Sequence, residues 1–297
     1  SSIIAKFGIK FHCYADDTQL YIEFTPGLDE SSVLARLEQC IDELRKWMFC
    51  NKLKFNECKT EFIILGTPSR LKKITTTSLQ VGSQSVASSP SVRNIGAYFD
   101  SSLRMDVQVR NTCKVAWLHL RSISKIKSYL TVDQLKAVMQ AYVVSHMDYN
   151  NSLLARSPDK LIEKLQLVQN AAARLVTGTR KYDHITPVLQ QLHWLPVRQR
   201  IAFKILFLTF KVLHGTGPSY LLDLLTRHLP SCALRSSSAP LLLDVPRTRL
   251  KTYGDRSFSA FVPVHWNQLP GYIRSLDSIS SFKTALKTHL FRNYYTA

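Results

Sequence analysis

The sequence has no apolar run long enough for a transmembrane helix and no paired-cysteine motif. A membrane-spanning helix needs about 20 consecutive apolar residues, and the best candidate, residues 201–213, is interrupted by Lys204 and Lys211. The six cysteines are scattered without a C-x-x-C pair, which indicates neither a standard zinc knuckle nor a disulfide framework. We therefore expect no membrane partner, no structural zinc and reduced thiols.

The amino terminus lacks the marks of a secretory leader. It has no initiator Met, and no basic segment followed by an apolar run and small residues. We expect a piece of a longer, intracellular protein of the nucleus or cytoplasm, not a secreted one. The 297 residues, 45% of them hydrophobic, suffice to bury the core of one large or two ordinary domains.

Acidic residues are scarce and unevenly distributed. The formal net charge is +18, yet residues 1–65 hold 8 Lys and Arg against 10 Asp and Glu, and residues 66–297 hold 31 against 11. Such a basic excess favours a polyanionic partner, because each neutralised phosphate releases counterions. A basic protein without that partner, or one that touches an anionic membrane, remains open on charge alone.

Hydrophobic periodicity predicts an α+β first part and a helical remainder. Residues 7–24 alternate apolar and polar on both sides of Tyr14-Ala15-Asp16-Asp17, which predicts a β-hairpin with the two aspartates at its tip. An amphipathic helix is expected after Asp29 as N-cap, followed by a strand at 60–65, a Ser- and Thr-rich hairpin near 80–87 and a strand at 92–99. The order β-β-α-β-β-β suits an antiparallel sheet with a covering helix.

Beyond residue 103 the expected elements are helices. Thr131 and Gln134 form a capping-box pattern, and Pro158 is expected at the first position of a helix that ends at Gly178. Further helices are expected at 197–213, from Pro218 and at 281–291, whereas 231–256 is expected to be a loop.

Two adjacent aspartates at a hairpin tip repel each other unless something neutralises them. Divalent cations would do so, because Mg²⁺ takes carboxylate and phosphate oxygens and a two-metal site stabilises both oxygens of a phosphoryl transfer. For the bare dipeptide an ordinary turn is the better interpretation. The surrounding sequence decides between the two.

Residues 11–21 closely resemble the Tyr-Ala-Asp-Asp box of reverse transcriptases from non-LTR (LINE-type) retrotransposons. The resemblance continues in family order along almost the whole chain, in elements of the chicken-repeat and jockey-like kind. The segments that carry it are Asn56-x-x-Lys59-Thr60-Glu61, residues 94–100, residues 165–175, residues 193–201, residues 266–270 and residues 282–288.

The resemblance implies an RNA-directed DNA polymerase. It makes Asp16 the metal-ligating carboxylate, with Asp17 beside it as a weaker ligand. It places Tyr14 near the primer end, while Ala15 leaves room for the template–primer backbone. Lys59 is similar in placement to a lysine proposed to act on the departing pyrophosphate, although a solvated surface lysine is nearly as good an interpretation.

Two further segments are implied to bind nucleic acid. Asn94 and Gly96 lie in a segment that looks like the hairpin that grips the primer terminus. Lys125 and Lys127, followed by Tyr129, resemble the start of a thumb on the template–primer duplex; cations at a helix end, favoured by the helix dipole, are an equal alternative. Trp194 is expected in the core in preference to a stacking role, and five arginines are candidates for phosphate contact: Arg198, Arg200, Arg247, Arg249 and Arg256.

The resemblance also implies a domain order and an incomplete site. We expect a truncated palm at 1–102, a helical thumb at 103–150 and a basic, mainly helical C-terminal region at 151–297. The family's polymerase needs a further catalytic aspartate on an earlier strand, and none of the 15 residues before Asp16 is acidic. We therefore expect Mg²⁺, an RNA template and a DNA primer as ligands of the intact parent, but weak Mg²⁺ binding and no primer extension by this chain. The alternative is a non-catalytic nucleic-acid-binding remnant.

Overall fold

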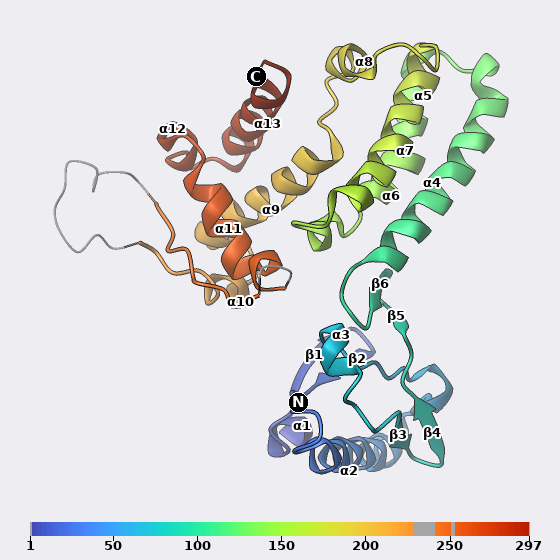
Figure 1. Cartoon of the computed structure of the whole chain (residues 1–297), viewed down its shortest axis with the longest axis vertical. Coiled ribbons are helices and arrows are strands. Elements are labelled where there is room, and N and C mark those ends of the chain that lie inside the picture. Colours follow the sequence, from blue (N-terminus) through green and yellow to red (C-terminus); the bar gives the residue numbers. More distant parts are fainter. Residues whose placement is uncertain (1, 229–240, 251–252, 297) are drawn as a thin grey trace. The chain divides into compact units, whose positions relative to one another are not determined.

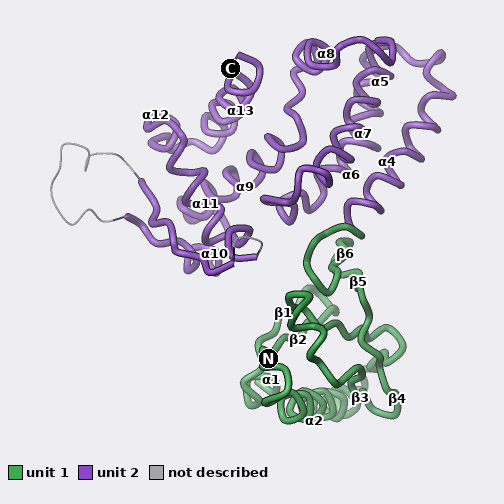
Figure 2. Tube along the Cα trace, viewed as in Figure 1, with its two compact units in different colours: residues 1–107 green, residues 108–297 purple. Residues whose placement is uncertain are grey.

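The computed structural model describes residues 2–228, 241–250 and 253–296. The chain divides into two compact units, residues 1–107 and residues 108–297 (Figure 2). Unit 1 carries all the strands named here, and unit 2 is helical. The fold is thus mixed α+β, mostly helical, with a few small antiparallel sheets, as the sequence predicted in outline. None of the described helices is both long and apolar enough to span a bilayer.

Unit 1 consists of three hairpins, one long helix and short helical turns (Figure 1). Its elements are α1 (Ser2–Lys6), β1 (Lys10–Tyr14), β2 (Asp17–Tyr21), α2 (Glu30–Cys50), η1 (Glu57–Lys59), α3 (Pro68–Leu71), β3 (Ser78–Val81), β4 (Gln84–Ala87), β5 (Ser91–Asn94) and β6 (Ala97–Asp100). Each sheet has two antiparallel strands, β1–β2, β3–β4 and β5–β6. The prediction of one antiparallel sheet is therefore wrong for the described residues, in which the strands form three separate hairpins.

The core of unit 1 lies between α2 and the first two hairpins. Buried side chains of α2 meet those of α1, β3 and the loop before β1, and partly buried side chains of β1 and β2 close the cluster. The buried members are Ile4, Ile9, Leu34, Leu37, Cys40, Ile41, Leu79 and Val81. Leu34, Leu37 and Ile41 are among the residues whose helical spacing identified α2 in the sequence.

Three local predictions in unit 1 need correction. Residues 92–99 form the two strands of the β5–β6 hairpin and not one strand. Residues 60–65 form no strand; Phe62 makes only an isolated bridge to Ser88. Asp29 does precede α2, but its side chain makes no capping hydrogen bond to the helix. Its Oδ1 accepts the backbone N–H of Thr25 at 2.6 Å instead, and so closes the turn before the helix.

Unit 2 is a helical assembly with short 3₁₀ and π segments. Its elements are α4 (Asp106–Ile126, which begins two residues before the unit boundary), η2 (Lys127–Tyr129), α5 (Val132–Met139), η3 (Gln140–Val144, a π-helical turn), α6 (Ser145–Asp148), η4 (Asn151–Leu154), α7 (Asp159–Thr177), α8 (Ile185–Gln191), α9 (Val197–Leu213), α10 (Ser219–Leu222), η6 (Gly254–Arg256), α11 (Phe258–Asn267), α12 (Gly271–Arg274) and α13 (Ile279–Tyr295).

The helix boundaries in unit 2 follow the sequence signals closely. The capping box of Thr131 and Gln134 is present, and α7 ends at Gly178, whose φ of +72° is the left-handed conformation that glycine adopts without strain. Pro158 is the residue before α7 and not its first helical residue, a shift of one position. Of the predicted loop 231–256, residues 231–240 and 251–252 lie outside the described residues, as does Cys232, and η6 interrupts the rest.

Three amide side chains in segments 165–175 and 266–270 hold the backbone of unit 2 in place. The Gln169 amide donates to the Leu195 carbonyl at 2.8 Å, and Gln166 Oε1 accepts the Val197 N–H at 3.0 Å. Asn267 pairs with both backbone groups of Leu243, at 2.7 and 3.0 Å. Since buried backbone polar groups need partners, these amides fix the segments before α9 and α11.

Candidate functional site

The Asp16–Asp17 pair lies at the tip of the β1–β2 hairpin, as the alternation predicted. Tyr14 pairs with Asp17, so Ala15 and Asp16 form a two-residue turn. Ala15 has φ +54°, the positive value that tight hairpin turns require at their first position. Asp16 and Asp17 are exposed, and Tyr14 next to them is 64% exposed. The hairpin therefore presents two carboxylates and an aromatic ring to solvent.

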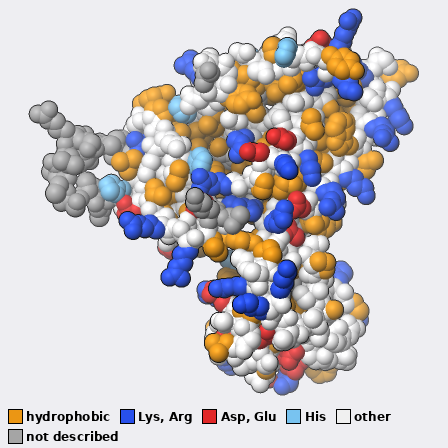
Figure 3. Space-filling view, in the orientation of Figure 1, with side chains coloured by type: hydrophobic (Ala, Val, Ile, Leu, Met, Phe, Trp, Pro, Cys, Tyr) orange, Lys and Arg blue, Asp and Glu red, His pale blue; other side chains and the backbone are white. Residues whose placement is uncertain are grey.

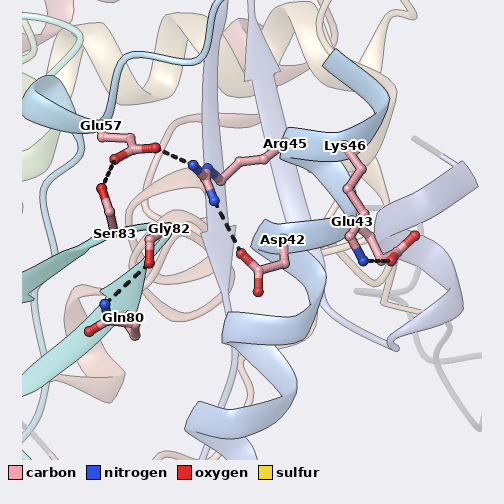
Figure 4. Close-up of polar contacts among 8 residues, drawn as sticks. All are labelled: Asp42, Glu43, Arg45, Lys46, Glu57, Gln80, Gly82 and Ser83. Atoms are coloured by element: carbon pink, nitrogen blue, oxygen red, sulfur yellow. Dashed lines mark hydrogen bonds and ion pairs between the residues drawn. The ribbon is translucent and has the colours of Figure 1, made fainter. Parts of the chain in front are cut away.

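Three pairs of adjacent acidic residues occur in the sequence, all in unit 1, and two of them have partners. In α2, Asp42 pairs with Arg45 at 3.5 Å and Glu43 with Lys46 at 2.8 Å (Figure 4). The contact with Lys46 lowers the pKa of Glu43.

At the start of α2 the other pair is satisfied by hydrogen bonds. Asp29 accepts from Thr25, and Glu30 accepts the backbone N–H groups of Thr75 and Thr76. The bond from Thr76 holds the pKa of buried Glu30 below its usual value. The side chains of Asp16 and Asp17, by contrast, have no hydrogen bond or ion pair with any part of the chain that the structure describes.

The third hairpin is tied to the first by a side-chain hydrogen bond. Gln19, in β2, donates from Nε2 to Asn94 Oδ1 at 2.8 Å. Asn94 ends β5, and Ile95 and Gly96 follow with φ of +43° and +75°, the two positive values of a type I′ turn. The structure thus brings Asn94 to the β1–β2 hairpin, and Gly96 lies in the turn that follows Asn94. Gln19 is the residue that sequence reasoning missed, since nothing marks a partner 75 positions away.

The carboxylate of Asp100 fixes the turn between β6 and α4. Asp100 accepts the N–H of Arg104 at 2.9 Å, the N–H of Met105 at 2.6 Å and the hydroxyl of Ser102 at 2.8 Å. Burial raises the pKa of Asp100, but these hydrogen bonds outweigh it, so the pKa lies below the usual value. Asp100 is therefore a structural acid at the entry to α4.

Lys59 ends η1, a short 3₁₀ turn in the loop after α2. Polar contacts around Arg45, which we call the Arg45 clamp, hold this loop in place. Glu57, two residues before it, forms an ion pair with Arg45 and accepts the hydroxyl of Ser83 at 3.4 Å (Figure 4). The Arg45 guanidinium also lies against Gly82, where an added Cβ would come within 2.3 Å of it. Lys59 itself is exposed, and among the described residues no hydrogen bond or ion pair joins it to Asp16 or Asp17.

Lys125 and Lys127 belong to unit 2 and differ in environment. Lys125 is exposed in the last turn of α4. Lys127 is half-buried, and its Nζ lies 4.0 Å from where a Cβ on Gly178 would be. A cation beside the carboxyl end of α7 is stabilised by the helix dipole. Lys127 therefore lies near the carboxyl end of α7, where its charge is favourable.

A basic stripe along α4 was not identified from the sequence. Arg110, Lys114, Arg121 and Lys125 are exposed at intervals of four, seven and four residues, and Trp117, 47% exposed, lies between them. These spacings place the five side chains on one helix face over about 22 Å. No carboxylate of the described residues pairs with these cations. Figure 3 shows Lys and Arg side chains along α4.

Of the five candidate arginines, three have structural partners. Arg198 pairs with Asp159, Arg200 with Asp148, and Arg256 donates to the carbonyls of Leu153 and Ala155 at 3.2 Å. Arg247 and Arg249 are exposed. Trp194 packs half-buried against Ala173, Val188 and Leu189, and its carbonyl accepts the Tyr295 hydroxyl at 2.8 Å. Trp194 thus packs at the edge of a core cluster and is only partly buried, which supports a structural role.

Metal-binding capacity in the described residues is limited. No group of three or more His, Cys, Asp or Glu side chains gathers there. The Asp16–Asp17 tip offers two hard oxygen ligands and space for others. No family model, curated protein sequence or solved structure matches the chain.

Proposed function

We propose that unit 1 carries part of the nucleotidyl-transfer site of an RNA-directed DNA polymerase of the non-LTR retrotransposon kind, with Asp16 and Asp17 as Mg²⁺ ligands. One observation supports this most strongly. Of the three adjacent acidic pairs, Asp16–Asp17 at the hairpin tip has no hydrogen bond or ion pair among the described residues, whereas Asp42–Glu43 pairs with cations and Asp29–Glu30 accepts backbone hydrogen bonds. Uncompensated like charges are unfavourable unless a cation joins them.

The chemistry of the donor set fits magnesium in part. Mg²⁺ commonly takes one or two protein carboxylates and completes its shell with waters and substrate phosphates. When bound, it would supply charge stabilisation for the attacking and leaving oxygens of phosphoryl transfer. The two aspartates of this chain would hold it at the turn. With two ligands only, affinity in the absence of phosphate is expected to be weak, and the chain alone is not expected to extend a primer.

The neighbouring residues would take the roles that the resemblance to a reverse-transcriptase palm implies. Tyr14 would lie against the primer terminus, with its ring exposed beside the aspartates, and Ala15 would keep the turn free of bulk. Asn94 and Gly96 would form the primer-grip hairpin, held at a fixed distance from the tip by Gln19. Lys59 would meet the pyrophosphate as a cation on a clamped loop.

Paramagnetic broadening by Mn²⁺ tests the metal site directly. In the presence of a nucleoside triphosphate, amide signals of residues 14–18 are expected to broaden at Mn²⁺ concentrations that leave those of Asp42 and Glu43 sharp. Asp16→Asn should remove the effect at the tip. Equal broadening at both acidic pairs, or an Asp16→Asn variant that broadens like the wild type, would contradict the assignment.

A second candidate function is nucleic-acid binding without catalysis. The basic stripe of α4 supports it, together with the charge of residues 108–297, which hold 26 Lys and Arg against 9 Asp and Glu. An ordinary solvated helix face is the simpler explanation of the stripe. Binding of an RNA template annealed to a DNA primer distinguishes the two functions. If variants of the α4 stripe lose this binding, and Mn²⁺ does not broaden the signals around Asp16, the non-catalytic function is favoured. Either role would place the protein in the nucleus or cytoplasm.

A further inference from the structure

The loop between α7 and α8 exposes a tyrosine among cations. Tyr182 is 91% exposed, one of the most exposed large side chains of the described residues. The ammonium of Lys181 lies 5.7 Å from the centroid of its ring, and Arg180 is exposed next to it. An exposed ring of this kind leaves both of its faces open to stacking by a ligand.

Hydrogen bonds fix the loop in one conformation. Arg174 donates from Nε to the Arg180 carbonyl at 3.2 Å and from Nη2 to the Asp183 carbonyl at 3.0 Å. Asp183 Oδ2 accepts the Arg180 N–H at 3.0 Å. The backbone on both sides of Tyr182 is thus anchored to α7, and the ring is held outward with little conformational entropy left to lose on binding.

A second exposed tyrosine lies in η2, whose Lys127 approaches the start of this loop. Lys127 reaches the position of a Cβ on Gly178 to within 4.0 Å, which places η2 beside the start of the loop. Tyr129, at the end of η2, is 85% exposed, and Lys125 is exposed just before it. The nearby acids are engaged, since Asp183 accepts from Arg180 and Asp133 pairs with Lys136 at 3.2 Å.

We propose that this surface, the tyrosine platform of Lys125, Tyr129, Arg180, Lys181 and Tyr182, binds unpaired nucleotides. Bases would stack on the two rings, and the cations would meet the phosphates, a combination that suits single strands. A duplex offers phosphates but hides the faces of its bases, so single strands are favoured. The platform lies within unit 2 and needs neither Asp16 nor polymerase activity. RNA and DNA share the required chemistry.

Binding of labelled twelve-nucleotide oligo(U) and oligo(dT) to the full chain, followed by fluorescence anisotropy, tests the platform. Tyr182→Ser should raise the Kd for single strands about tenfold, whereas Tyr182→Phe, which keeps the ring, should bind like the wild type. Tyr272→Ser removes another exposed tyrosine, on α12, and should have no effect. A duplex with the same number of phosphates should not distinguish Tyr182→Ser from the wild type.

A second pair of variants, Lys181→Gln and its control Lys160→Gln, tests the phosphate contacts. Lys181→Gln should reduce the slope of log Kd against log salt by about 0.7, and Lys160→Gln, exposed at the other end of α7, should leave it unchanged. Comparison of the two oligonucleotides shows whether a 2′-hydroxyl adds to binding. Equal losses for Tyr182→Ser and Tyr182→Phe, equal losses on duplex and single strand, or no loss would overturn the proposal. Asp16→Asn should bind single strands normally, which separates this test from that of the metal site.

Discussion

Replacing Gly82 by alanine should destabilise unit 1 more than the same change at Gly27. Both glycines have positive φ, +61° and +75°, so each alanine would meet a similar backbone penalty of about 1 kcal/mol. At Gly27 an added Cβ meets nothing within 4 Å, whereas at Gly82 it would meet the Arg45 guanidinium within 2.3 Å. The guanidinium must move, and its ion pair with Glu57 would be lost.

The size of the difference follows from that ion pair. The side chains of Arg45 and Glu57 are 32% and 20% exposed, so a charged hydrogen bond is partly screened there and contributes about 1 to 2 kcal/mol. Gly82→Ala should therefore cost about 1.5 kcal/mol more than Gly27→Ala. In an Arg45→Ala background the excess should vanish, because the atoms that clash are gone.

Hydrogen exchange of the slowest amides of α2 gives the free energy of unfolding of unit 1. Amides of residues 57–60 report on the clamped loop and should exchange faster in Gly82→Ala but not in Gly27→Ala. Equal costs for the two alanine variants in the wild-type background, or an excess that persists without Arg45, would refute the clamp.

Three further predictions concern other contacts. Asp100→Asn should cost about 2 kcal/mol at neutral pH; because the pKa of Asp100 is depressed below its ordinary 3.8, its stabilisation is complete above that pH and is lost as the pH falls through the lower folded value. Acid titration of hydrogen exchange in unit 1 should show a step that the variant lacks. Gln19→Ala should free the two hairpins from each other and speed exchange in β5 and β6, whereas Gln80→Ala on β3 should not. Removal of two charges from the basic stripe, as Lys114→Gln with Arg121→Gln, should weaken binding of duplex DNA and reduce its salt slope by about 1.8, measured by anisotropy.

The sequence predicted the elements whose signals are local. Period-two alternation placed the β1–β2 hairpin, and the spacing of apolar residues placed α2, α7 and α9, the last with the observed bounds. The capping box and Gly178 marked helix ends because each is a contact between near neighbours. The aspartate pair was found for the same reason, since both the pair and the turn are contained in a few residues.

The missed features depend on contacts between distant segments. The expected strand at 60–65 has the right composition, but Phe62 finds only Ser88 as a bridge partner and the ladder does not extend. β-propensity describes fit to a half-buried surface, and no neighbouring strand supplies one there. The bond from Gln19 to Asn94 and the Arg45 clamp join residues whose proximity no local pattern reveals. The basic stripe of α4 could be recognised only from the structure, which shows that its cations are exposed and unpaired among the described residues, whereas several other cations form ion pairs.

Cleavage of the polypeptide by Fe²⁺-generated hydroxyl radicals locates the metal at the hairpin tip, because Fe²⁺ substitutes for Mg²⁺ at oxygen-rich sites and the radicals cut the backbone nearby. If Asp16 and Asp17 hold the metal, cleavage should fall between residues 14 and 18, be reduced by competing Mg²⁺, be enhanced by a nucleoside triphosphate and be abolished by Asp16→Asn. Cleavage at Asp42 and Glu43 instead, or cleavage at the tip that survives Asp16→Asn, would contradict a metal site at the hairpin.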